Sequence, residues 1–228
     1  MKRRRPGLQH RWAYVVNSLQ QIIPSYEVAS SRISLFSDRR MRAEVVAFAV
    51  RRGSLVLDLG SGPGTLSKVV LRAGGYPILT DVSRAMLLAA PVASRVQAVF
   101  ECLPFREGVF DAVVSGFAVR DALDLPVAIS EVKRVLKSGG RFSFCDLGKP
   151  DSFIKALLIA AYLRTLPPII GLATTGRLGL KYGSLYDTYL LVLKNSELAS
   201  ALSTAFGHVS VHETQLGGAV VAKCAAEA

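Results

Sequence analysis

Short apolar runs alternate with helix-like segments along the middle of the chain. Runs of five or six residues predict buried strands at 55–59, 76–80, 96–100, 110–115 and 141–146. Between them, apolar residues recur every three or four positions, which predicts helices at 64–73, 83–90 and 125–136. Strands that alternate with helices are typical of a parallel sheet, which binds its ligands at the carboxyl ends of the strands. The residues at those ends are Asp58, Asp81, Gly116 and Asp146.

Helix-like patterns also precede and follow this alternation. The preceding ones predict helices at 9–23, 26–36 and 38–50, the last with Ser37 and Asp38 as its cap. An apolar, helical-looking insertion covers about 151–195, with Pro167-Pro168 and several glycines expected to break it. A helix and two strands end the chain, at 196–205, 209–213 and 219–224.

These elements predict an α/β fold: a Rossmann-like, seven-stranded, mostly parallel sheet with N-terminal helices and a helical insertion after the fifth strand. Residues 1–52 form a basic arm and helices that pack on the core, and residues 53–228 form the main domain. A length of 228 residues with 50% hydrophobic composition is enough for one large core with such additions.

Charge and cysteine content narrow the range of partners. The net charge is +11, and the first eleven residues carry five basic side chains and no acid, at Lys2, Arg3, Arg4, Arg5 and Arg11. A basic arm suits nucleic acid or an anionic membrane, and the alternative is a solvated tail. The three cysteines have no metal-binding spacing, and Cys145 and Cys224 are expected to be core residues.

The apolar segments do not predict a membrane protein. The N-terminus has no apolar signal region, and Lys155, Arg164 and Pro167-Pro168 interrupt the most apolar region, 153–173, which leaves it short of a spanning helix. We therefore expect a cytoplasmic protein that has at most a peripheral contact with a membrane.

One stretch in the alternation carries a recognisable motif. Asp58 comes shortly before three spaced glycines, Gly60, Gly62 and Gly64. Glycines let a backbone turn sharply and approach a ligand, and the following helix start offers free N–H groups. The spacing is not the G-x-G-x-x-G of dinucleotide sites, because Thr65 holds the sixth position. Asp58 suits an ammonium better than a pyrophosphate, and Asp81 is placed to hold ribose hydroxyls.

This combination resembles the cosubstrate site of class I S-adenosylmethionine-dependent methyltransferases; the alternative is a glycine turn with Asp58 as a local cap. The resemblance implies no metal and a cosubstrate site made of Asp58, Gly60, Ser61, Gly62, Gly64, Asp81, Val82, Met86, Glu101 and Gly116. Residues 103–105, 110–114 and 131–141 resemble loops and turns of the same class. Within them, Asp111 is expected to order a loop and Arg134 to lie on a solvated helix face.

Three further stretches resemble one subfamily, the C-methyltransferases of ubiquinone and menaquinone biosynthesis. They are 26–42 (YEVASSRISLFSDRRMR), 117–124 (FAVRDALD) and the DLGKP of 146–150 that leads into the insertion. The resemblance covers nearly the whole chain beyond residue 25. Val99 departs from the Asn or Asp that the family usually has near the adenine, which leaves that contact to the backbone of Phe100 or Glu101, and Asp121 replaces an Asn.

The resemblance implies methylation of a ring carbon in a small lipophilic substrate, a prenylated quinol such as demethylmenaquinol. A ring carbon attacks well only when a neighbouring hydroxyl loses its proton. We expect Arg120 to stabilise the oxyanion and Asp121 to take the proton; the alternative is an Arg–Asp pair that fixes the loop. Expected substrate contacts are Tyr26, Arg39, Phe117, Tyr162 and Tyr189. Alternative acid–base groups are Tyr182, Tyr186, Tyr189 and His208.

Several alternatives stay open at this point. The apolar insertion suits a channel for a prenyl tail, a membrane-facing patch, an ordinary cap core or a homodimer interface. The chain could instead methylate another lipophilic phenol, or RNA through its basic arm, although no RNA-binding module is recognisable. An alternative from another class is a non-catalytic scaffold with a degenerate site, for which Val99 is the best hint.

Overall fold

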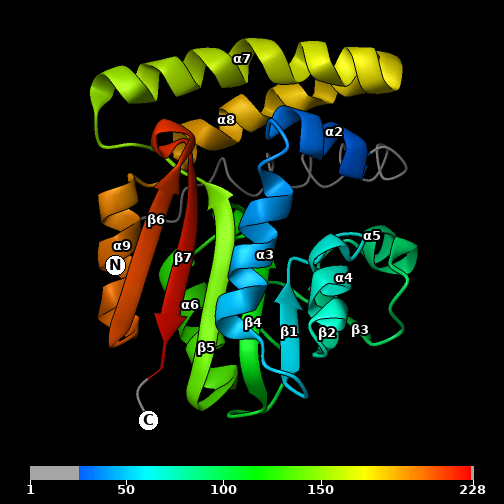
Figure 1. The fold of residues 1–228 in the computed structure, drawn as a ribbon, viewed down its shortest axis with the longest axis vertical. Coiled ribbons are helices and arrows are strands. Elements are labelled where there is room, and N and C mark those ends of the chain that lie inside the picture. The colour runs from blue at the N-terminus through cyan, green and yellow to red at the C-terminus, as the bar shows by residue number, and fades with distance from the viewer. Residues whose placement is uncertain (1–25, 227–228) are drawn as a thin grey trace.

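A seven-stranded sheet in the order β3-β2-β1-β4-β5-β7-β6 forms the centre of the molecule (Figure 1). A computed structural model describes residues 26–226, without a few side chains such as that of Tyr26. The strands are β1 Leu55–Leu59, β2 Tyr76–Asp81, β3 Arg95–Gln97, β4 Phe110–Gly116, β5 Leu136–Leu147, β6 His208–Thr214 and β7 Ala219–Ala225. The first five pair in parallel, while β7 runs antiparallel between β5 and β6. The predicted Rossmann-like, mostly parallel sheet is confirmed.

Helices cover both faces of this sheet (Figure 1). On one face lie α3 Asp38–Ala49 and α4 Thr65–Arg72, and on the other α6 Leu125–Val135 and α9 Asn195–Ala205. Neighbouring strand residues such as Val56 and Leu57 point to opposite faces, and both are fully buried. This two-sided burial explains why the central strands are continuous apolar runs rather than alternating ones.

A helical cap covers the carboxyl ends of the parallel strands (Figure 1). It is built from α2 Tyr26–Ile33, α7 Phe153–Thr175, the 3₁₀ segment η3 Gly176–Gly183 and α8 Ser184–Leu191. A further short helix, α5 Arg84–Ala89, follows β2 beside the sheet. The predicted helix at 9–23 lies outside the described residues. The cap therefore comes from two parts of the chain that are more than a hundred residues apart.

The insertion differs from its prediction because Pro167 and Pro168 do not break it. They lie inside α7, which runs without a break for 23 residues. Each proline removes one backbone donor, and beyond them the backbone of Gly171 lies close to that of Gly179 in η3. The expected interruption of the apolar region is therefore wrong. By length and composition, Phe153–Thr174 is long enough to cross a membrane, and only 17% of its most apolar window is buried.

The third strand is also shorter than expected. The apolar run predicted a strand at 96–100, but β3 ends at Gln97, and Val99 instead forms an isolated antiparallel bridge with Cys102. The chain turns here because Phe100 packs toward the glycine turn after β1, where its ring lies close to Gly60. Packing against a distant segment has thus overridden the local strand pattern.

Two predicted polar roles are wrong and one is confirmed. The Ser37 side chain does not cap α3; its hydroxyl donates to the Ser34 carbonyl, 2.7 Å away. Arg134 is not simply solvated, because it pairs with Glu131 and donates to the carbonyls of Leu103 and Phe105. Asp111 does order its surroundings, accepting from the Leu55 amide at 2.8 Å. The core positions of Cys145 and Cys224 are also confirmed.

Candidate active site

The turn between β1 and α4 lies directly beneath the cap. Gly60 has φ = +68°, and a Cβ there would come within 2.5 Å of the Ala118 Cβ and 2.9 Å of the Phe100 ring. Only glycine therefore fits, both for its backbone conformation and for the space around it. Gly64 also has a positive φ, but its neighbours are Leu79 and Ala90, so it shapes the start of α4 rather than the cavity.

Asp58 is completely buried below this turn. Its Oδ2 accepts a hydrogen bond from the Ser67 hydroxyl at 2.5 Å, whereas its Oδ1 has no partner among the described residues. Burial raises the pKa of Asp58 to about 6, although Ser67 and the charge of Arg42 act in the opposite direction. Asp58 lies behind the residues that form the cavity wall, and its Oδ1 is a buried acceptor that still lacks a donor among the described residues.

Asp81 ends β2 on the wall of the same cavity. Its two oxygens accept from the backbone amides of Gly62, at 2.9 Å, and Ser83, at 2.8 Å. Burial raises the pKa of Asp81, while these amides lower it. The two hydrogen bonds fix the carboxylate next to the glycine turn, as expected for an acid that holds ribose hydroxyls.

Arg120 and Asp121 lie in a short 3₁₀ segment after β4, η2 Val119–Asp121. The Arg120 guanidinium donates to Asp146 Oδ1 at 2.5 Å, and its backbone amide donates to Asp146 Oδ2 at 2.9 Å. Asp121 is farther away, with Oδ1 3.9 Å from Arg120 Nε. Arg120 is therefore held mainly by Asp146 at the end of β5, a partner that the sequence analysis placed at a strand end but did not pair with it.

Asp121 has the environment of a group that exchanges protons near neutral pH. Burial raises its pKa to about 6; Arg120 lowers it, and the charges of Asp146 and Asp81 raise it further. Asp121 lines the cavity together with Arg120. A carboxylate with a pKa near 6 is ionised at pH 7 and is still basic enough to accept a proton.

One cavity between the strand ends and the cap brings most of the predicted site residues together. Its wall includes Gly60, Ser61, Gly62, Asp81, Val82, Met86, Gly116, Phe117, Arg120, Asp121 and Tyr162. Residues from the cap, Ile159, Leu163 and Leu185, form its apolar side. Among the described residues, no group of three or more His, Cys, Asp or Glu side chains is placed to hold a metal ion.

Some predicted residues lie elsewhere. The Glu101 carboxylate accepts from the amides of Leu123 and Asp124 and so stabilises the loop before α6. Glu101 does not line the cavity. Arg39 is exposed on α3 and lies outside the cavity wall. The Tyr26 side chain is outside the described residues. These positions give no support to a direct contact from Glu101 or Arg39.

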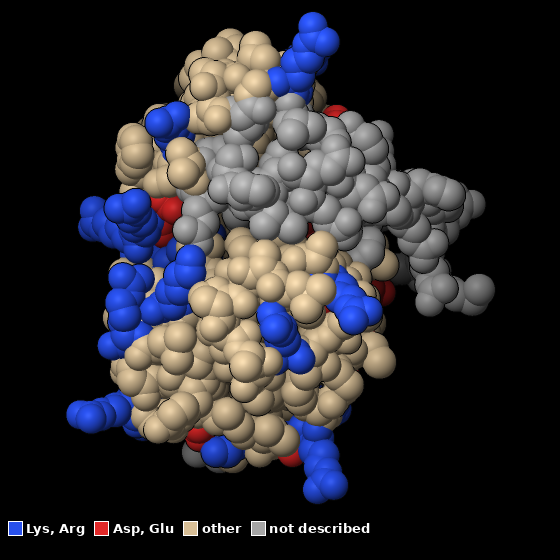
Figure 2. Space-filling view, turned by 90° about the vertical axis from the view of Figure 1, so that its right-hand side faces the viewer, with Lys and Arg blue, Asp and Glu red and all other residues tan. Residues whose placement is uncertain are grey.

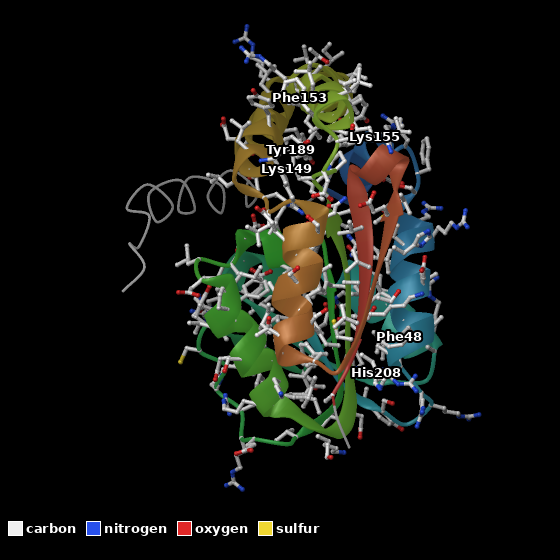
Figure 3. The ribbon with its side chains drawn as sticks, turned by 90° about the vertical axis from the view of Figure 1, so that its left-hand side faces the viewer. Phe48, Lys149, Phe153, Lys155, Tyr189 and His208 are labelled. Atoms are coloured by element: carbon white, nitrogen blue, oxygen red, sulfur yellow. The ribbon has the colours of Figure 1, made fainter. Side chains whose placement is uncertain are left out.

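Of the four alternative acid–base groups, some lie outside the cavity as well. Tyr189 donates to the Ala156 carbonyl at 3.1 Å, and its ring centre lies 5.8 Å from Lys149 Nζ (Figure 3). Tyr189 does not line the cavity. His208 is at the opposite end of the sheet from the cap (Figure 3), and Tyr186 lies under Arg164. Tyr182 alone among these four lines the cavity.

Residues of the N-terminal helices also enter the site, and the sequence analysis did not assign them there. Arg42, Ser34 and Ser37 line the cavity, as does Gln215 near the end of the chain. Arg42 does belong to the stretch that carries the family resemblance, but its position next to the cosubstrate motif depends on how α3 packs on the sheet. No local pattern in the sequence gives that position.

Comparison with known proteins identifies the family of this chain. A family model described as a methyltransferase domain matches residues 57–144. A demethylmenaquinone methyltransferase of Paenarthrobacter aurescens is 31% identical over 231 residues, which cover 96% of this chain and 87% of that protein. A ubiquinone/menaquinone biosynthesis C-methyltransferase, UbiE, of Syntrophotalea carbinolica is 33% identical over 75% of this chain and 76% of its own length. This chain belongs to the C-methyltransferases of ubiquinone and menaquinone biosynthesis.

A solved structure supports the fold of this C-methyltransferase. A possible histamine N-methyltransferase of Thermotoga maritima superposes with a TM-score of 0.64 over 92% of this chain and 99% of its own, at 16% identity. At that identity the likeness shows the fold alone. The methyltransferase uses S-adenosylmethionine, and the unpartnered buried Asp58 oxygen, the Gly60 turn and the fixed Asp81 carboxylate fit this cosubstrate.

Proposed function

We propose that this C-methyltransferase methylates a ring carbon of a prenylated quinol such as demethylmenaquinol. The observation that carries the proposal is the composition of the single cavity described above. Its polar end holds Asp81 and Asp121, and its other end is closed by apolar cap residues such as Ile159 and Leu163. A ring with hydroxyls and an apolar tail matches these two ends, and the names of the relatives support the same substrate class.

The chain itself contributes positioning and a proton acceptor. S-adenosylmethionine, when bound, supplies an electrophilic methyl group. Asp121 takes the proton of a quinol hydroxyl, which makes the neighbouring ring carbon nucleophilic. Arg120, held by Asp146, faces the negative charge that develops on that oxygen. The cap excludes water from the pair of reactants, which strengthens these electrostatic interactions.

The decisive experiment is turnover of S-adenosylmethionine with a short-chain demethylmenaquinol, with the methylated atom assigned. An RNA pool and a no-acceptor sample run beside it. A methyl group on the ring carbon supports the proposal. Methylation of RNA or of other phenols, without methylation of the quinol, contradicts it. Failure to bind S-adenosylmethionine at all would instead favour a non-catalytic binding protein.

The proposed roles of Arg120 and Asp121 need separate variants. Arg120→Ala and Asp121→Ala are expected to lose ring methylation while keeping cosubstrate affinity, because both residues face the acceptor. Asp187→Ala, an exposed acid on α8, is the matched control and keeps wild-type turnover. Wild-type rates in Asp121→Ala would exclude it as the proton acceptor.

We further propose that α7 lies on an anionic membrane surface, where a prenylated quinol resides. Phe153 and Ile154 are 79% and 70% exposed, and Leu157, Leu158 and Ile169 are also exposed. The inward residues of the same helix line the cavity, so α7 separates the cavity from its surroundings. Phe153 and Lys155 lie together at the outer end of the cap (Figure 3), and basic side chains outnumber acidic ones on the face in Figure 2.

Vesicle binding tests this membrane contact. Phe153→Ser/Ile154→Ser is expected to lower co-sedimentation with phosphatidylglycerol vesicles, whereas Leu71→Ser, an exposed apolar residue on α4, is not. Sedimentation velocity on the same samples distinguishes a homodimer through this face, which would contradict the membrane proposal. The basic arm lies outside the described residues, and its contact with lipid stays a prediction.

A further inference from the structure

Arg42 of α3 is a buried cation at the polar end of the cavity. Only 5% of the residue is exposed, and it lines the cavity wall. Its guanidinium lies against the backbone of Gly116, where it occupies the space of a Cβ, and 5.2 Å from the centre of the Phe117 ring. The ring faces the cation and helps to hold it at the end of β4.

The donors of this guanidinium are not all used within the chain. Its Nε is buried and has no hydrogen-bond partner among the described residues. A buried charged donor without an acceptor is costly, because it has lost its water without gaining a replacement. An anionic ligand in the cavity would remove that cost.

The position of Arg42 identifies which part of the ligand it meets. Across the sheet the order is β2, β1, β4, which places Asp81 on one side and Asp58 and Gly116 on the other. Asp81 holds the ribose side of the methyl donor, so its amino-acid side lies over the ends of β1 and β4. That side carries one ammonium and one carboxylate.

Asp58 and Arg42 are both buried charges near this point. Asp58 Oδ1 and Arg42 Nε are buried and have no hydrogen-bond partner among the described residues, and the two side chains are near enough for Arg42 to lower the pKa of Asp58. Arg42 lines the cavity, and Asp58 lies directly behind the glycine turn that does. We infer that Arg42 binds the carboxylate of the amino-acid moiety of S-adenosylmethionine, while Asp58 binds its ammonium. The pair thus recognises a zwitterion. This inference rests on the methyl-donor part of the proposed function and is independent of the quinol.

Two features of the backbone fit this role. Gly116 leaves room for the guanidinium, since any Cβ there would displace it. Phe117 has φ = +65°, a backbone conformation that residues other than glycine rarely adopt. Such strain is concentrated at ligand sites, and here it accompanies the contact between the ring and Arg42.

Calorimetry with two ligands tests the inference without any acceptor. S-adenosylhomocysteine carries the carboxylate, and its decarboxylated analogue keeps every other group. Arg42→Met is expected to lose roughly 10- to 100-fold in affinity for the first ligand and almost nothing for the second. Arg42→Lys, which keeps the charge, is expected to lose less. Arg40→Met on the exposed side of α3 is the matched control and keeps both affinities.

Each other outcome contradicts the inference. Equal losses for both ligands would show that Arg42 supports the shape of the site rather than binding the carboxylate. Unchanged binding with a raised KM for the quinol would make it an acceptor contact. If thermal melting shows that Arg42→Met does not fold, Gly116→Ala provides the second test, since it displaces the guanidinium without removing it. Because only binding is measured, failure of the quinol assay leaves this test valid.

Discussion

The two ends of the cavity are built in opposite ways. At the strand ends, the buried Asp58 and the half-buried Asp81 are held by hydrogen bonds from a hydroxyl and from backbone amides. At the cap, long helices contribute apolar side chains, and α7 exposes a large part of them. The strand ends therefore bind one cosubstrate through fixed charges. The cap instead presents an apolar surface that fits substrates with apolar tails.

This difference predicts where a substitution acts. Changes at the strand ends should alter cosubstrate affinity and proton transfer by large factors, because buried charges have few alternative partners. Changes on the outer face of the cap should leave the fold, and with it the reaction, intact. Exposed apolar side chains contribute little to the free energy of unfolding.

The largest effect is expected for Asp58→Ala. Removing this carboxylate takes away the proposed partner of the ammonium and leaves Arg42 as an unbalanced buried charge, which should cost about 2–5 kcal/mol of binding free energy. Calorimetry with S-adenosylhomocysteine measures this loss. Asp111→Ala, at the opposite end of the sheet, is the control and should keep the affinity. A loss below about threefold for Asp58→Ala would remove the central role of this group.

A smaller effect is expected for Gly60→Ala. The new Cβ would overlap Ala118 and Phe100 in addition to straining a backbone with φ = +68°, so unfolding should become easier by roughly 2–4 kcal/mol. Gly53→Ala has the same kind of strain, at φ = +85°, with nothing within 4 Å, and should cost only about 1–2 kcal/mol. Urea unfolding of both variants isolates the steric part; equal values would show that no close packing exists at Gly60.

Asp121→Asn should separate stability from activity. Because the folded pKa is about 6 and the ordinary value 3.8, the ionised carboxylate disfavours the folded state above pH 6. The variant should therefore be more stable at pH 8, by about 1–2 kcal/mol, and the difference should vanish toward pH 4. Ring methylation by the wild type should fall as pH drops below about 6, where Asp121 becomes protonated. Unfolding curves measure the stability difference and pH–rate profiles measure ring methylation. Either quantity staying constant between pH 4 and pH 8 would contradict this prediction.

The smallest effect is expected on the outer face of α7. Leu157→Ser, at a side chain that is 58% exposed, should change the free energy of unfolding by less than about 0.5 kcal/mol. Leu163→Ala, whose side chain faces the cavity and is 3% exposed, should cost about 2–4 kcal/mol. Thermal unfolding compares the two. Similar losses would mean that the outer face of α7 is packed and not available to a membrane.

Much of the polar end of the cavity could be predicted from sequence, because its residues follow from the order of strands and helices along the chain. The alternation of strands and helices places Asp58, Asp81 and Gly116 at one edge of the sheet, whatever the details of packing. The glycine spacing after Asp58 then indicates a turn that approaches a ligand. These are properties of neighbouring residues, and the structure confirms their placement.

The partners within the site were decided only by tertiary structure. Arg120 pairs with Asp146, 26 positions away, and Phe100 turns out of its predicted strand to meet Gly60. Arg42 reaches the end of β4 because the apolar side of α3 packs on the sheet, which no motif encodes. The close approach of Gly171 in α7 to Gly179 in η3 likewise joins segments that no local pattern pairs. Local periodicity predicts which segments form strands, but the end of a strand such as β3 and the contacts between distant segments depend on how whole surfaces fit together.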